Sequence, residues 1–169
     1  NAQLEHAVGI LLADGTARDG LLILHADLPL ATAEAIVTLA ALGLRAAPIP
    51  LAPDGLDLDR LDAVLAQRNV RLIYTMPSFH NPTGTSSDLA HRRRLLEIAG
   101  RHGVPILEDD FEKDLRVRGR GAPPLRALDR HGIVSYLGTF SKTLFPPARV
   151  GWLFAPPAIA AAAVFPTRT

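Results

Sequence analysis

The sequence contains no cysteine among its 169 residues. This absence excludes disulfide scaffolds, thiolate nucleophiles and cysteine-based zinc or iron–sulfur sites. It is consistent with a reducing compartment, and we expect a cytoplasmic protein. An excess of charge of one sign is also missing, because 18 Lys and Arg stand against 17 Asp and Glu and leave a formal charge of +1. This balance argues against binding of nucleic acid through bulk electrostatics by this segment.

Long apolar runs are lacking as well. No stretch reaches the roughly 18 residues of a membrane-spanning helix, and no signal peptide is recognisable, so we expect no membrane partner. Aromatic residues make up 5% of the chain, whereas all hydrophobic residues together make up 48%. This profile is that of an ordinary globular domain, and one domain of this size buries roughly 70% of its unfolded surface.

Short apolar runs alternate along the chain with segments of helical periodicity. Strands that are apolar on both faces and separated by helices predict an α/β fold, a doubly wound and mostly parallel sheet with helices on both faces. The segment 46–51 is expected at an edge, because its two prolines remove ladder donors. The expected strands are 21–24, 46–51, 71–76, 104–107, 133–137 and 150–154, and the expected helices are 4–12, 33–41, 58–65 and 87–101. The charged run 91–94 of the last helix is expected to lie mostly outward.

Polar clusters follow three of these strands, at the ends where ligands bind in such sheets. The first cluster, 77–84, carries Asn81, whose amide is held by Pro82 as a fixed hydrogen-bond donor. The alternative interpretation of this segment is a Pro/Gly turn that enters the next helix.

The second cluster is Glu108-Asp109-Asp110. Such carboxylates can hold a metal ion, face solvent, or act as the buried counter-ion of a cationic ring nitrogen. A magnesium–nucleotide site of the P-loop type requires G-x-x-x-x-G-K-[ST]. Lys142 is the only Lys followed by Ser or Thr, and Tyr136 and Ser141 stand where that motif needs glycine, so this class is excluded.

The third cluster surrounds Lys142, one of two lysines in the chain. A lysine here is either a surface side chain or a desolvated amine, whose lowered pKa lets it form a Schiff base with an aldehyde. The hydroxyls of Thr139 and Ser141 and the guanidinium of Arg149 suit a phosphate group.

One ligand satisfies all three clusters. Pyridoxal 5′-phosphate has an aldehyde for Lys142, a ring nitrogen for Asp109, a ring hydroxyl for Asn81 and a phosphate for the third cluster. In this interpretation Asp109 keeps the ring nitrogen protonated, and Lys142 is the catalytic residue that moves a proton during the reaction.

The segments 74–84, 107–110 and 138–146 resemble the class I/II aminotransferases of fold type I. The amino-acid sequences of these segments are most similar to those of the aminotransferase-like domain of MocR-type GntR regulators and of aminoadipate and kynurenine aminotransferases. The spacing also matches, with 33 residues from Asp109 to Lys142 and seven from Lys142 to Arg149. The resemblance covers nearly the whole chain, and by the same matching Ala2 and Gln3 offer backbone N–H groups to the phosphate.

This resemblance implies an amino acid and a 2-oxo acid as substrates, and a homodimer. It implies that residues 1–169 form a partial large cofactor-binding domain, incomplete at both ends and without the N-terminal arm and the small domain. The chain departs from the family at Phe111 and Glu112, where a Tyr is usual, and has no aromatic residue before Tyr74 to stack on the ring; His25 is the nearest stand-in.

Three hypotheses follow for function. The first is an aminotransferase that works through a Lys142 Schiff base. The second is the effector domain of a MocR-type regulator, which binds DNA only through an upstream winged helix. The third is an α/β scaffold that has lost its cofactor.

Overall fold

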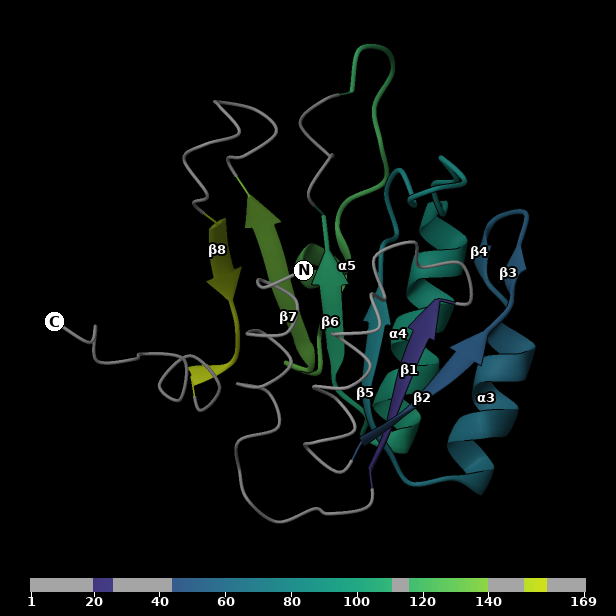
Figure 1. Ribbon diagram of the computed structural model, residues 1–169. Helices are drawn as coiled ribbons and strands as arrows, with labels where there is room; N and C mark the ends of the chain where they lie inside the picture. Colours follow the sequence, from purple (N-terminus) through teal and green to yellow (C-terminus); the bar gives the residue numbers. More distant parts are fainter. Residues whose placement is uncertain (1–19, 26–43, 111–115, 140–150, 158–169) are drawn as a thin grey trace, which may run out of the picture.

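A six-stranded sheet forms the centre of the computed structural model, which describes residues 20–25, 44–110, 116–139 and 151–157 (Figure 1). The strands lie in the order β2-β1-β5-β6-β7-β8. Neighbouring strands are parallel except for β7 and β8, which confirms the mostly parallel sheet predicted from the sequence. The strands are β1 (Gly20–His25), β2 (Leu44–Ile49), β5 (Val70–Thr75), β6 (Ile106–Asp109), β7 (Val134–Thr139) and β8 (Gly151–Phe154).

The predicted edge strand is at an edge, because β2 is the outermost strand beside β1. It begins and ends two residues earlier than expected, since β2 ends at Ile49, before Pro50, which has no N–H to donate. The chain then turns into a small antiparallel hairpin of β3 (Leu51–Ala52) and β4 (Gly55–Leu56). Gly55 adopts a φ of 136°, a conformation that L side chains rarely reach.

Three described helices pack on one another beside the sheet (Figure 1). They are α3 (Leu58–Gln67), α4 (Leu89–His102) and the short α5 (Leu125–Leu128), which the sequence did not predict. The Asp88 side chain caps α4 by accepting from the backbone N–H of His91 at 2.8 Å, and Gly103 ends the helix with a φ of 65°. The predicted helices 4–12 and 33–41 lie outside the described residues. Among the residues that are described, no helix has the length and apolarity needed to cross a bilayer.

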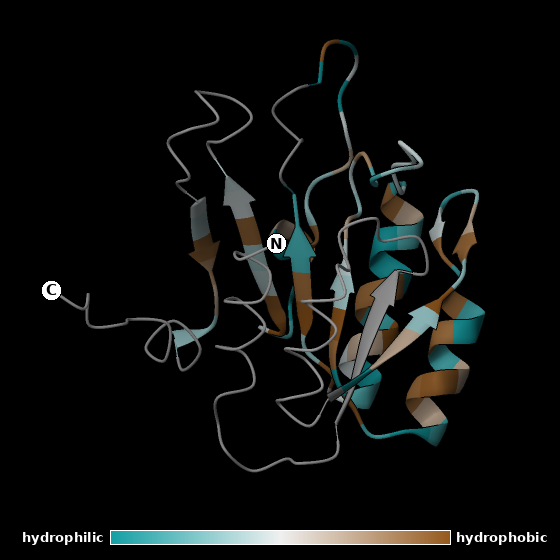
Figure 2. Ribbon diagram, viewed as in Figure 1, coloured by the Kyte–Doolittle hydropathy of each residue, from teal (hydrophilic) through white to brown (hydrophobic). Residues whose placement is uncertain are grey.

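The core lies between the sheet and this helix layer. Leu61 of α3, Ile73 of β5 and Ile106 of β6 are fully buried there. In Figure 2, β6 is hydrophobic along its shaft, where it contributes to this core, and hydrophilic at its arrowhead. The apolar centre of the strand therefore stabilises the sheet, whereas its polar carboxyl end is available for chemistry.

Two strands extend further than the apolar runs predicted. β6 ends at Asp109 rather than Leu107, and β7 ends at Thr139 rather than Leu137. Glu108 and Asp109 stay in the ladder because their carboxylates accept hydrogen bonds inside the protein. The polar residues assigned to the loops after these strands are thus held by the sheet itself.

Candidate cofactor site at the carboxyl edge of the sheet

The three polar clusters meet at one edge of the sheet. β5, β6 and β7 are adjacent and parallel, so their carboxyl ends lie side by side (Figure 1). Asp109 is the last residue of β6, Thr139 is the last residue of β7, and the loop with Asn81 follows β5. The structure therefore brings together three of the site residues that the sequence predicted.

The three consecutive carboxylates after Leu107 divide between the two faces of the sheet, because side chains alternate along a strand. Glu108 points toward the helix layer, where it accepts from the backbone N–H groups of Leu125 at 2.7 Å and Arg126 at 2.9 Å. Asp110 shares that face. Asp109 points to the opposite face, away from these helices, where it meets Tyr74 of β5.

Asp109 is buried, with 6% of its surface exposed, and it accepts a hydrogen bond from Tyr74. The Tyr74 hydroxyl lies 2.7 Å from Asp109 Oδ2. The register explains the contact: Tyr74 is paired with Leu107, which puts Tyr74 and Asp109 on the same face of neighbouring strands. Burial, and then the charge of Asp109, raise the pKa of Tyr74 well above its ordinary value, so the hydroxyl stays a donor.

Glu108 and Asp110 stabilise the other face. Burial raises the pKa of Glu108 to about 7, although its two backbone donors act in the opposite direction. The Tyr136 hydroxyl donates to Asp110 Oδ2 at 3.1 Å. Glu108 therefore connects the sheet to α5 and Asp110 connects to β7, both on the face opposite to Asp109.

The loop that carries Asn81 is held by its own hydrogen bonds. The backbone N–H of Gly84 donates to the carbonyl of His80 at 2.6 Å, and the N–H of His80 donates to the carbonyl of Thr85 at 2.8 Å. The N–H of Phe79 donates to Ser86 Oγ at 2.9 Å. Asn81 is half-buried at the tip of this network and precedes a cis proline.

Arg92 connects this loop to the helix layer and was missed by the sequence analysis. The run 91–94 was expected to lie mostly outward, but Arg92 has 1% of its surface exposed and His91 is also buried. Its guanidinium donates to the carbonyls of Ser87, Pro123 and Pro77, at 3.1, 3.1 and 2.8 Å, and to Ser78 Oγ at 3.0 Å.

A signal for the burial of Arg92 was present in the sequence. Arg92, Leu95, Leu96 and Ala99 follow helical spacing and form one face of α4. Burial lowers the pKa of Arg92, and the charges of Glu108 and Asp110 oppose that shift. Arg92 thus sits among carbonyls and carboxylates that keep it charged.

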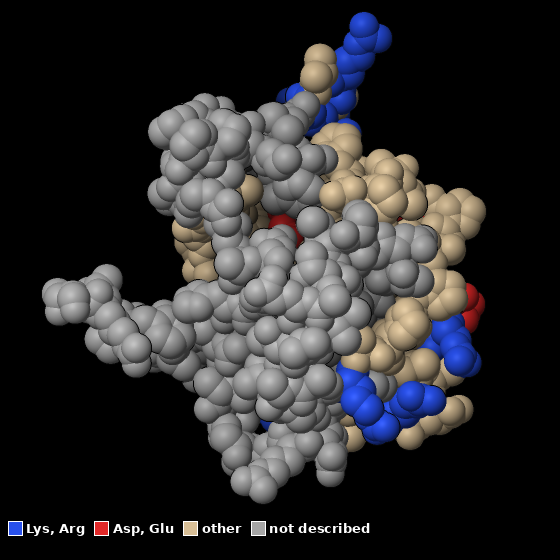
Figure 3. Space-filling model, in the orientation of Figure 1, with Lys and Arg blue, Asp and Glu red and all other residues tan. Residues whose placement is uncertain are grey.

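A basic segment stands beside the candidate site. The Arg116 guanidinium lies 4.5 Å from the centre of the Phe79 ring, a cation–π contact next to the Asn81 loop. Arg118 and Arg120 follow on the exposed loop that precedes α5. Figure 3 shows Lys and Arg side chains projecting at the top of the molecule in this region.

Lys142, Ser141, Arg149, Ala2 and Gln3 lie outside the described residues, as do Phe111 and Glu112. His25 is described only as part of the backbone of β1. The structure therefore shows where Asn81, Asp109 and Thr139 lie, at one edge of the sheet, while the cofactor contacts of these residues, of Lys142 and of the phosphate ligands stay predictions.

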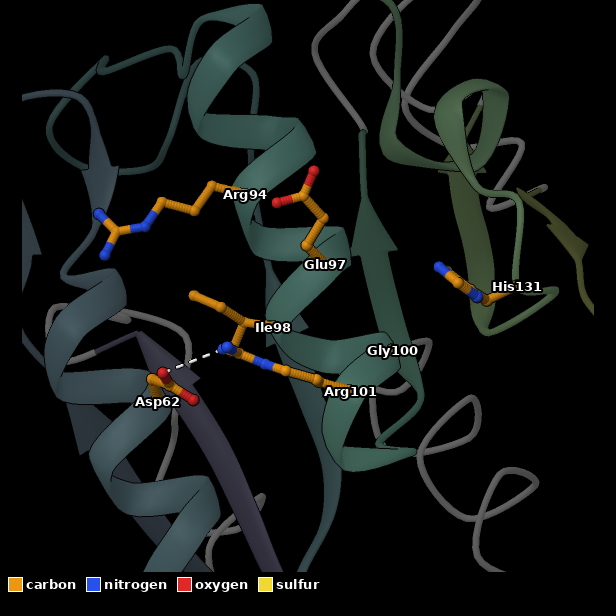
Figure 4. A pocket seen from close by; sticks show the side chains of 7 residues that line it. All are labelled: Asp62, Arg94, Glu97, Ile98, Gly100, Arg101 and His131. Carbon is orange, nitrogen blue, oxygen red and sulfur yellow. Dashed lines mark hydrogen bonds and ion pairs between the residues drawn. The ribbon is translucent and has the colours of Figure 1, made fainter.

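A separate surface cavity of about 510 Å³ lies between α3, α4 and the turn before β7 (Figure 4). Asp62 accepts from Arg101 at 3.0 Å across it, and His131 borders its other side. Arg101 is near the end of α4 and His131 precedes β7, so this cavity is near the amino ends of the strands and away from Asp109. No group of three or more potential metal ligands occurs within the described ranges.

The chain is similar in sequence to aminotransferases and to transcriptional regulators. Aromatic-amino-acid aminotransferase 1 of Thermococcus litoralis is 40% identical over 114 residues, which cover 64% of this chain and 27% of that protein. The probable rhizopine catabolism regulatory protein MocR of Rhizobium meliloti is 40% identical over 118 residues, covering 70% and 23%. The chain thus spans about a quarter of the length of these relatives.

Among solved structures, the kynurenine aminotransferase of Pyrococcus horikoshii in complex with PMP superimposes with a TM-score of 0.83 at 30% identity. The match covers 95% of this chain and 40% of that one. The profile of the family described as aminotransferase class I and II matches residues 27–165, which include the Asn81 loop, Asp109 and the segment around Lys142. The chain belongs to the aminotransferase class I and II family.

Proposed function

We propose that the chain is the cofactor-binding part of a pyridoxal-phosphate-dependent aminotransferase, which transfers an amino group between an amino acid and a 2-oxo acid. The observation that carries this proposal is Asp109, a buried carboxylate at the carboxyl edge of the sheet, beside Thr139 and the Asn81 loop. A carboxylate in that place fits a protonated pyridine nitrogen. The residues present therefore fit the cofactor on the ring side.

Each residue has a defined task in this proposal. Asp109 holds a proton on the ring nitrogen, and Asn81 donates its amide to the ring hydroxyl. Pyridoxal phosphate, when bound, supplies an aldehyde and a ring that accepts electrons from the substrate Cα. Lys142 supplies the amine that binds the aldehyde and afterwards moves the proton.

The phosphate end of the cofactor would be held by hydroxyl, guanidinium and backbone donors. The Thr139 hydroxyl at the end of β7 is the one of these donors that lies within the described structure. Bidentate contacts from arginine and backbone N–H groups at a helix start are typical phosphate ligands. The set is Thr139, Ser141, Arg149 and the backbone of Ala2 and Gln3.

The relatives support this proposal. Two of the proteins compared above are aminotransferases, and the solved structure of the Pyrococcus horikoshii enzyme contains PMP, the amino form of the cofactor. We propose in addition that the protein is cytoplasmic and works as a homodimer. Sedimentation of the full-length protein would test the homodimer.

The first experiment is an absorbance spectrum of the full-length protein with added pyridoxal phosphate, before and after borohydride. We expect a visible band that borohydride fixes covalently to the wild type. Lys142→Ala should lack the fixed band, whereas Lys113→Ala, a change of the other lysine of the chain, should keep it. Absence of the band in folded wild-type protein would leave the third hypothesis, a scaffold that has lost its cofactor.

A second candidate is the effector domain of a MocR-type regulator. It is favoured by the identity to the Rhizobium meliloti regulator, which equals the identity to the Thermococcus litoralis aminotransferase. A transamination assay and a DNA-binding assay on the full-length protein would separate the two. Amino transfer without DNA binding supports the enzyme, and DNA binding that changes with the cofactor supports the regulator.

A further inference from the structure

Tyr74 is a buried phenol inside the apolar run of β5. It has 1% of its surface exposed, and its neighbours Leu72 and Ile73 are fully buried. A tyrosine in such a place needs a partner for its hydroxyl, because an unpaired buried hydroxyl is costly. The partner is Asp109 Oδ2 on the adjacent strand, at 2.7 Å.

The bond affects Asp109 in two ways. It fixes the orientation of the carboxylate, because one oxygen is held by a side chain of the rigid sheet. It also stabilises the ionised form, because a neutral hydroxyl that donates to a carboxylate lowers the proton affinity of that carboxylate. Burial of Asp109 acts in the opposite direction, so the hydrogen bond offsets a cost that the site itself creates.

The same arrangement occurs once more in the described structure, on the other face of the sheet. Tyr136 of β7 donates to Asp110 Oδ2 at 3.1 Å, and both groups are buried. The two pairs flank β6, but Asp110 faces the helix layer and Asp109 faces away from it. Comparison of the two pairs therefore separates the contribution of such a hydrogen bond to the stability of the fold from its effect on a ligand.

We propose that Tyr74 is a positioning residue for the cofactor, and that its hydrogen bond to Asp109 Oδ2 keeps this carboxylate ionised and oriented toward the ring nitrogen. The inference rests on the proposed function, since it assigns the partner of a residue in the proposed site. Tyr74 acts through Asp109 and not by contact with the reacting atoms. Its removal should therefore change the charge on the ring as well as the stability of the fold.

The test compares Tyr74→Phe with Tyr136→Phe in the full-length protein. Both variants lose one buried hydrogen bond to a carboxylate, and we expect both to lower the unfolding midpoint. In Tyr74→Phe alone, the bound cofactor should dissociate about tenfold faster, as expected when a hydrogen bond to a charged group is lost.

The absorbance of the bound cofactor gives the second readout. A positive ring nitrogen lowers the pKa of the nitrogen that joins Lys142 to the cofactor. A less strongly ionised Asp109 makes the ring less positive. The pH midpoint of the visible absorbance change should therefore rise by about half a unit or more in Tyr74→Phe and stay at the wild-type value in Tyr136→Phe.

A double variant covers the case in which Tyr74→Phe folds poorly because it leaves a buried carboxylate without its donor. Asp109→Asn removes that charge, and Tyr74→Phe added to Asp109→Asn should shift the midpoint no further than Asp109→Asn alone. An additional shift would overturn the proposal, because Tyr74 would then act by another route.

Two failures are distinguishable. If wild-type protein shows no band that borohydride fixes, the proposed function fails, and the role of Tyr74 fails with it. If the wild type shows the band but Tyr74→Phe keeps its midpoint and its dissociation rate, the cofactor assignment stands and the role of Tyr74 is overturned.

Discussion

Arg92 offers a direct test of how the Asn81 loop is held. Its guanidinium donates in several directions, through Nε to the Ser87 carbonyl, through Nη1 to the Pro123 carbonyl, and through Nη2 to the Pro77 carbonyl and Ser78 Oγ. The substitution Arg92→Lys keeps the charge beside Glu108. A lysine ammonium is a point donor and cannot reach acceptors on all sides of the guanidinium plane.

The magnitude follows from the bonds that are lost. At least two of the four bonds should be lost, and a hydrogen bond from a charged donor contributes about 1.5–3 kcal/mol. The Pro77 carbonyl still accepts from the N–H and Oγ of Ser87, at 2.9 and 3.1 Å, when Arg92 is changed. Loss of the Arg92 bond to this carbonyl should therefore be the least costly. We expect Arg92→Lys to lower the free energy of unfolding by about 3–5 kcal/mol.

Urea denaturation of the full-length protein measures this loss through the shift of the transition midpoint. The matched control is Arg93→Lys, the same exchange at the next position of α4, where the side chain is exposed. It should change the stability by less than about 0.5 kcal/mol. Equal effects of the two exchanges would show that the buried network does not hold the loop, and the reasoning would be refuted.

Two further predictions concern strands β6 and β7. The free energy of unfolding should depend on pH through Glu108, because the pKa of this carboxyl is raised to about 7 in the folded protein from 4.5 in the unfolded chain. Glu108→Gln should remove this dependence. The folded state binds the extra proton between these values, so the free energy of unfolding should fall as pH rises from 4.5 to 7, by at most about 3 kcal/mol. Denaturation across this pH range checks it, with the exposed Glu97→Gln as control, and an unchanged slope in Glu108→Gln would contradict it. Gly138→Ala should cost about 1–3 kcal/mol, because a Cβ there would approach the Trp152 ring of β8 closer than 3.0 Å. The smaller side chain of Trp152→Leu should recover part of this loss in the double variant, and an absence of recovery in thermal unfolding would argue against the clash.

Much of the architecture was predictable because it depends on local patterns. The six strands of the central sheet all overlap apolar runs in the sequence, and α3 and α4 fall on segments of helical spacing. Boundaries were less accurate, since β6 and β7 each extend two residues beyond their apolar runs, to Asp109 and Thr139. The short α5 has no periodic pattern of its own, and its first N–H groups are held by Glu108 from 17 residues away.

The candidate site was predicted in part. The sequence placed Asn81, Asp109 and Thr139 at strand ends, and the parallel order of β5, β6 and β7 brings these ends to one edge. Arg92 was interpreted as an outward side chain because charge is usually solvated, although its position on the buried face of α4 was visible in the spacing. The roles of all the site residues stay predictions from the sequence, both for Asn81, Asp109 and Thr139 and for Lys142, Ser141, Arg149, Ala2 and Gln3.

By itself the sequence determined the alternation of strands and helices, the position of each polar cluster along the chain, and the family to which the spacing belongs. These properties are one-dimensional, since periodicity and motif spacing depend on neighbouring residues. Tertiary structure alone decided which carboxylate faces which side of the sheet and which partner it meets. Tyr74 and Asp109 are 35 positions apart, and Arg92 and Pro123 are 31 apart. Contacts of this kind depend on strand register and on the packing of α4 against the sheet, and neither is encoded in any short segment of the chain.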